Sequence, residues 1–166
     1  MRTFLGAPLL GIAVILASNA SETPAARCFG ELAGSWQGTG TVNGMAADMR
    51  MTWEPALDGQ FQQLTLDNRM TAADGKEWHF KAQAFYRIGD DGSITGNWFD
   101  SRGISLPLRG KVDGNNLLTI DWGGESTERG RSSYRVSREV LVVTDEVLTK
   151  EGDFRVFGRT TLKRLP

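Results

Sequence analysis

Hydrophobic and polar residues alternate along most of this chain with the two-residue period of a β-strand. The clearest alternation runs through residues 78–88, where apolar side chains occupy one parity and His79, Lys81 and Gln83 occupy the other. Such a pattern predicts strands with one face in a core and the other in water. No sustained apolar pattern at helical spacing accompanies it, so the chain is expected to be all-β.

Turn dipeptides separate the strand-like segments. Asn-Gly and Asp-Gly pairs recur at short intervals and supply the positive φ angles of tight hairpins. About ten strands are predicted, near residues 35–42, 48–57, 60–70, 77–88, 93–101, 104–112, 116–122, 132–137, 140–149 and 154–164. Every junction is too short for a βαβ crossover or for the long connections of a sandwich, so we expect an up-and-down antiparallel β-barrel.

The segment 32–42 is expected to be the first strand of this barrel. Trp36, Gly38 and Gly40 share one parity, and two bare positions after an indole indicate close packing against another backbone. We expect this strand to close the ring by pairing with residues 154–164.

The N-terminal residues have the pattern of a secretory signal peptide. Arg2 precedes an apolar run over residues 4–17, and small residues follow at 18–20. We therefore expect a signal peptide at 1–20, a flexible lead-in at 21–28 with a short helical turn after it, and a single barrel domain at 29–166. The protein is predicted to be periplasmic or secreted, and an uncleaved membrane anchor is the alternative.

Charge and residue counts exclude several classes of function. With 19 basic and 20 acidic residues, the chain has no electrostatic reason to bind nucleic acid or an anionic membrane. We expect no stable membrane insertion after signal cleavage. Cys28 is the single cysteine and His79 the single histidine, which is too few for a zinc cage. No Gly-x-Ser-x-Gly elbow occurs. We predict no catalytic residue, no metal and no cofactor, and the sequence leaves the oligomeric state open.

The segment Leu32-Ala33-Gly34-Ser35-Trp36-Gln37-Gly38-Thr39-Gly40 resembles the Gly-x-Trp-x-Gly-x-Gly start of calycin-type barrels, the group of lipocalins and fatty-acid-binding proteins. The segments 53–61 and 96–103 resemble uncharacterised bacterial secreted lipocalin-like proteins, and nitrobindin is a more distant likeness. The resemblance implies a barrel that holds a small ligand. Nitrobindins bind haem through a histidine near the C-terminal end, and this chain has no histidine after His79, so no haem ligand carries over.

Strand parity selects candidate ligand-binding residues. Five tryptophans fall in five different predicted strands, and a barrel would gather them around one interior, where they either fill a core or line a cavity. Trp36 is expected to fill the core. Asp100 shares a face with Trp98 and would need a partner such as Arg69 or Arg159, unless it bonds the Arg102-Gly103 turn. The candidates for ligand binding are Trp53, Arg69, Phe80, Tyr86, Trp98, Asp100, Trp122 and Arg159.

The sequence therefore predicts an exported, non-catalytic protein that binds a small, largely apolar ligand inside a barrel. Two alternatives remain open. One is an enzyme that uses the same cavity and requires a buried carboxylate with a shifted pKa. The other is a structural or interaction protein with a filled barrel.

Overall fold

The computed structural model describes residues 22–114 and 116–166, so the expected signal peptide at 1–20 lies outside the described residues. Within them the chain forms one helix and ten strands. The elements are α1 (Pro24–Leu32), β1 (Gly34–Val42), β2 (Met45–Ala56), β3 (Phe61–Thr71), β4 (Glu77–Ile88), β5 (Ile94–Asp100), β6 (Ser105–Asp113), β7 (Leu117–Gly123), β8 (Arg129–Val136), β9 (Val140–Leu148) and β10 (Phe154–Arg164).

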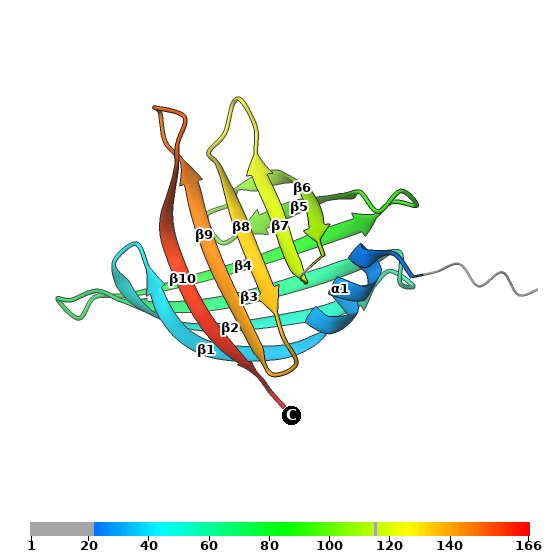
Figure 1. The fold of residues 1–166 in the computed structure, drawn as a ribbon. Coiled ribbons are helices and arrows are strands. Elements are labelled where there is room, and N and C mark those ends of the chain that lie inside the picture. Colours follow the sequence, from blue (N-terminus) through cyan, green and yellow to red (C-terminus); the bar gives the residue numbers. More distant parts are fainter. Residues whose placement is uncertain (1–21, 115) are drawn as a thin grey trace, which may run out of the picture.

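The strands form a closed antiparallel barrel in which each strand pairs with its neighbours in the sequence and β1 pairs with β10 (Figure 1). The predicted all-β, up-and-down barrel is therefore confirmed. Asn43 and Gly44 both have positive φ in the β1–β2 hairpin, as the turn pattern requires. Pro107, which cannot donate a ladder hydrogen bond, pairs in regular register with Asn97.

Two glycines let the first and last strands approach closely. Gly38 pairs with Leu162 and Gly40 with Thr160. A Cβ atom on Gly38 would lie 2.0 Å from the Thr161 carbonyl oxygen, and one on Gly40 would lie 2.1 Å from that of Arg159. Barrel closure thus explains why these two positions of the first strand are glycines without a side chain.

Helix α1 covers one end of the barrel, which we call the helix end, and packs against β6, β7 and β8 (Figure 1). Its buried side chains are Ala25, Cys28, Phe29 and Leu32, one stripe at helical spacing. The expected flexible lead-in at 21–28 is therefore wrong in its second half. Thr23 caps the helix by accepting a hydrogen bond from the Ala26 amide, and Pro24 suits the first helical turn rather than breaking it.

Arg164 near the C-terminus ties the helix to the barrel wall. Its guanidinium donates hydrogen bonds to the carbonyl oxygens of Glu31 (2.7 Å) and Ala33 (2.5 Å) at the C-terminal end of α1. It also lies 4.1 Å from the ring centroid of Trp36. Trp36 is fully buried and donates from Nε1 to the Leu32 carbonyl, so it fills the core as expected.

The barrel has a second, open end formed by the hairpins β1–β2, β3–β4, β5–β6, β7–β8 and β9–β10. The aromatic core lies toward the helix end, where Phe29 contacts Trp53 and Tyr86 with ring centroids 5.8 and 5.6 Å apart. Among the described residues, no helix has the length and hydrophobicity needed to span a membrane.

The expected strand bounds differ most at β2, which begins at Met45 rather than near residue 48, and at β8, which begins at Arg129 rather than near residue 132. The inward position there is Gly130, and a Cβ on it would lie 2.2 Å from the Trp122 ring. A glycine that makes room for an indole carries no apolar signal, so alternation could not reveal these residues as strand.

The closure predicts a stability effect at Gly38. Gly38→Ala is expected to lower the free energy of unfolding by at least about 2 kcal/mol, because the added methyl group must push β1 away from β10. Urea denaturation measures this. Gly124→Ala, where a Cβ would meet open space, is the matched control and should change stability little. Equal stability of the two variants would contradict the proposed tight closure.

A candidate ligand cavity

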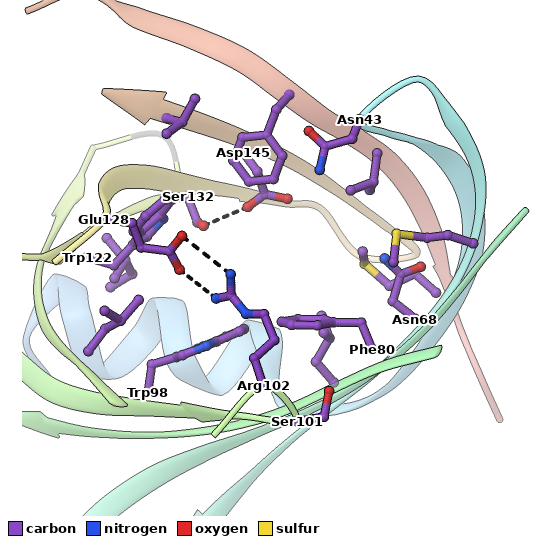
Figure 2. A pocket seen from close by; sticks show the side chains of 18 of the residues that line it. Asn43, Asn68, Phe80, Trp98, Ser101, Arg102, Trp122, Glu128, Ser132 and Asp145 are labelled. Atoms are coloured by element: carbon purple, nitrogen blue, oxygen red, sulfur yellow. Dashed lines mark hydrogen bonds and ion pairs between the residues drawn. The ribbon is translucent and has the colours of Figure 1, made fainter. Parts of the chain in front are cut away.

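The barrel encloses a cavity of about 730 Å³ that reaches the open end. Its wall is mostly apolar, with aromatic and methionine side chains contributed by strands on all sides (Figure 2). The aromatic and methionine lining residues are Met45, Met49, Met51, Met70, Trp78, Phe80, Tyr86, Trp98, Trp122, Tyr134 and Phe157.

The aromatic side chains of the wall are fixed by contacts with one another. Phe80 stacks on Trp98 with ring centroids 6.3 Å apart. Trp122 meets Phe157 edge-on at 6.5 Å. The β9–β10 register shifts between Val156 and Gly158, and this bulge accompanies the placement of Phe157 in the cavity lining.

Four of the eight candidate residues from the sequence line the cavity, and four do not. Phe80, Tyr86, Trp98 and Trp122 lie in its wall. Trp53 is buried beneath it and stacks on Tyr86 with centroids 5.6 Å apart. Arg69 and Arg159 are exposed, because the inward parity of β3 belongs to Asn68 and that of β10 to Thr160.

Asp100 is satisfied locally and takes neither Arg69 nor Arg159 as its partner. Its side chain is fully buried and accepts hydrogen bonds from Trp98 Nε1 (3.0 Å) and from the Arg102 amide (2.8 Å) and guanidinium (2.7 Å). Burial raises the pKa of Asp100, but these hydrogen bonds outweigh it, so the pKa is lowered. Asp100 thus bonds the turn at Arg102, the alternative that the sequence left open.

Arg102 connects two hairpins at the cavity mouth. Its guanidinium donates to both carboxylate oxygens of Glu128, at 2.5 and 3.3 Å, so β5–β6 and β7–β8 are joined by an ion pair (Figure 2). The hydrogen bonds to Asp100 and Glu128 raise the pKa of Arg102 further, so the group stays charged. Arg102 also lies 5.6 Å from the Phe80 ring centroid.

Asp145 is a cavity residue that the sequence analysis missed. It lies on β9 opposite Ser132 of β8, and the Ser132 hydroxyl donates to its Oδ1 at 2.6 Å (Figure 2). Gly158 of β10 leaves room for the carboxylate, because a Cβ there would lie 3.1 Å from Asp145 Oδ2. Although Asp145 faces the cavity, burial raises its pKa to about 6, while the Ser132 hydrogen bond lowers it in part.

Asn68 is the second polar group in the wall. It is 3% exposed, and its Oδ1 atom has no hydrogen-bond partner among the described residues. Tyr86 and Tyr134 add two phenol groups to the lining. Burial is the main cause that raises the pKa of both phenols, so they remain protonated and can donate hydrogen bonds.

The single histidine and the single cysteine are the remaining candidates for reactive side chains. His79 lies on the outer parity of β4, where its Nε2 is 2.8 Å from Asp67 Oδ1. Cys28 is fully buried in α1, and burial raises its pKa to about 11, which suppresses the thiolate. Across residues 22–114 and 116–166, no group of three His, Cys, Asp or Glu side chains is placed to hold a metal ion.

Comparison of the sequence with protein-family models and with curated proteins yields no match. Among solved structures, Rv2717c from M. tuberculosis is similar, with a TM-score of 0.63 and 17% identity over 87% of this chain and 99% of that one. A protein of unknown function from the DUF3598 family of Nostoc punctiforme matches with a TM-score of 0.30 and 6% identity, over 83% of this chain and 98% of that one. The first likeness supports the barrel fold alone, and the second is too low to carry an argument.

Asp145 predicts a pH-dependent cost to stability. Its folded pKa of about 6 lies above the ordinary 3.8, so between these values the folded protein holds a proton that the unfolded chain has released. The free energy of unfolding therefore falls as pH rises through this window. Asp145→Asn should match the wild type near pH 4 and exceed its stability by roughly 3 kcal/mol at pH 7. Urea denaturation at several pH values measures the difference, and a constant difference would contradict the assignment.

Proposed function

We propose that this protein binds a small, largely apolar molecule inside its barrel, as a lipocalin-like carrier without a catalytic role. The observation that carries the proposal is the hollow interior. A volume of about 730 Å³ falls within the range of roughly 300–1,000 Å³ typical of ligand pockets. A barrel of this kind could instead be packed solid with side chains, and this one is not.

The chemistry of the wall supports an apolar ligand. The stacked pair Phe80–Trp98 and the edge-on pair Trp122–Phe157 present aromatic surface to the cavity. Methionine side chains add flexible apolar surface that adapts to irregular shapes. Removing a ligand's apolar surface from water contributes about 25 cal/mol per Å², so affinity would arise mainly from burial. Asp145, Ser132 and Asn68 provide polar atoms in the wall that would orient such a ligand.

The open end supports access from solvent. Trp78 at the mouth is 49% exposed, while the Arg102–Glu128 ion pair spans part of the opening. A ligand would enter between the hairpins and pass the aromatic side chains of the wall. The helix end is closed by α1 and by the aromatic cluster of Phe29, Trp53 and Tyr86.

We also propose that the protein is exported, to the periplasm or the cell exterior. The support is the charged, apolar and small-residue pattern of residues 1–20. On this proposal the carrier meets its ligand outside the cytoplasm. Its stability then comes from the core, because a lone cysteine cannot form an internal disulfide.

A second candidate function, an enzyme in the same cavity, is favoured by one observation. Asp145 has a pKa of about 6, close to neutral, and a general acid or base works best under that condition. Ser132 is its hydrogen-bonded neighbour. An enzyme would convert its ligand chemically, whereas a carrier would release it unchanged. Recovery of a chemically changed ligand after incubation with the protein would support the enzyme.

The carrier proposal predicts that filling the cavity abolishes binding. Retinol, decanol and a porphyrin form a suitable panel, read by quenching of the protein's tryptophan fluorescence. Displacement of N-phenyl-1-naphthylamine, excited outside tryptophan absorption, gives the affinities. Val147→Trp inserts an indole into the cavity and should weaken binding at least about tenfold.

Val142→Trp is the matched control, since Val142 lies on the outward parity of the same strand. Its affinities should stay within about twofold of the wild type. If no panel member binds the wild-type protein, the carrier proposal is wrong.

A further inference from the structure

Asp145 is a charge inside an apolar cavity without a counter-ion. Of the described residues, only Ser132 donates a hydrogen bond to its carboxylate, and that bond engages Oδ1 alone. Figure 2 shows the second carboxylate oxygen directed away from Ser132. With a pKa of about 6, the group is mostly ionised at pH 7. A buried carboxylate without a cation is costly, so a bound cation would relieve this cost.

The neighbouring strands supply no cation to Asp145. Its pKa is set by burial and by Ser132, without a contribution from any basic side chain. On β10 the facing position is Gly158, and on β8 it is Ser132. The other titratable or charged residues of the cavity lining are His79, Tyr86, Arg102, Glu128, Tyr134 and Arg155.

The basic residues of that set are engaged or exposed. His79 lies against Asp67, with 2.8 Å between Nε2 and Oδ1, and Arg102 is paired with Asp100 and Glu128. Arg155 is exposed near the start of β10, and its guanidinium makes no ion pair with Asp145. The negative charge of Asp145 is therefore uncompensated within the cavity.

Asn68 supplies a second, independent observation. It is nine-tenths or more buried, lines the cavity and has an amide oxygen to which none of residues 22–114 and 116–166 donates a hydrogen bond. Its strand, β3, is separated from β9 in the ring by β10, β1 and β2. The cavity therefore offers acceptor oxygens on two well-separated parts of its wall, and a ligand that carries hydrogen-bond donors would satisfy them.

We propose that the ligand is a lipophilic amine, whose ammonium group binds the Asp145 carboxylate while its apolar body packs against the aromatic wall. This inference rests on the proposed carrier function and names its ligand class. Charge-assisted hydrogen bonds between ammonium and carboxylate are the strong kind, and they strengthen further in a low dielectric. The aromatic faces of the wall also attract a desolvated cation.

The same geometry disfavours an anionic ligand such as a fatty acid. A second carboxylate near Asp145 would be repelled unless one of the two took up a proton. Of the two arginines in the lining, Arg102 already has its two carboxylate partners in place, and Arg155 is exposed near the start of β10. An apolar alcohol fits the cavity but gains no charge pairing.

The test compares three ligands of equal chain length, decylamine, decanol and decanoate, by isothermal titration calorimetry with the full-length protein at pH 7. Decylamine should bind at least about tenfold more tightly than the other two, the effect of a charge-assisted hydrogen bond. Asp145→Asn, which keeps the shape of the side chain, should abolish this preference. Glu146→Gln is the matched control, because Glu146 is the next residue on β9 and has outward parity.

The pH profile adds a readout that needs no variant. An alkylammonium, like a lysine side chain, stays charged between pH 5 and 7, whereas Asp145 takes up a proton as pH falls through about 6. Decylamine affinity should therefore drop about tenfold from pH 7 to pH 5, and decanol affinity should not change.

The outcomes separate this inference from the proposed function. Equal affinity for decylamine and decanol, or a preference that persists in Asp145→Asn, would overturn the amine proposal and leave the carrier function standing. Tightest binding by decanoate would do the same. Binding by none of the three ligands, nor by the panel above, would overturn both.

Discussion

Every property of the cavity depends on the pairing of the first strand with the last. β1 and β10 make the junction that turns a meander into a ring, and Gly38 and Gly40 permit it because no Cβ stands between the two backbones. β10 also shapes the cavity where it pairs with β9. Its bulge accompanies the inward placement of Phe157, and Gly158 leaves room for the Asp145 carboxylate. Closure and site are thus built by one strand.

Most of the fold could be predicted from alternation and turn residues, because each hairpin is a local structure with its own signal. The failures have local causes. Helix α1 is nine residues long, and its apolar stripe is too short to stand out beside Pro24, which looks like a break but starts the helix. The start of β8 was missed because Gly130, packed against Trp122, replaces the expected apolar residue.

The candidate site could be predicted only in part. Parity places Phe80, Tyr86, Trp98 and Trp122 on the wall, because side-chain direction follows from strand position. Parity does not tell how far along the barrel a residue lies, so Trp53 belongs to the core beneath the cavity. Asp145 follows an apolar run of both parities, residues 140–143, which obscures the inward face of β9. The partners of Asp100 depend on the shape of a turn.

The pairing of β1 with β10 also bears on how the chain folds. The residues that meet there lie more than a hundred positions apart in the sequence, whereas every other strand pair joins neighbours. Contacts of such long range form slowly, because the entropy of closing the loop is lost before the contact stabilises anything. The hairpins can form as soon as their own residues are available. The ring, and with it the hollow interior, can form only after the last eleven-residue strand has been synthesised. Loss of the C-terminal strand would therefore leave two open sheet edges, a surface prone to aggregation.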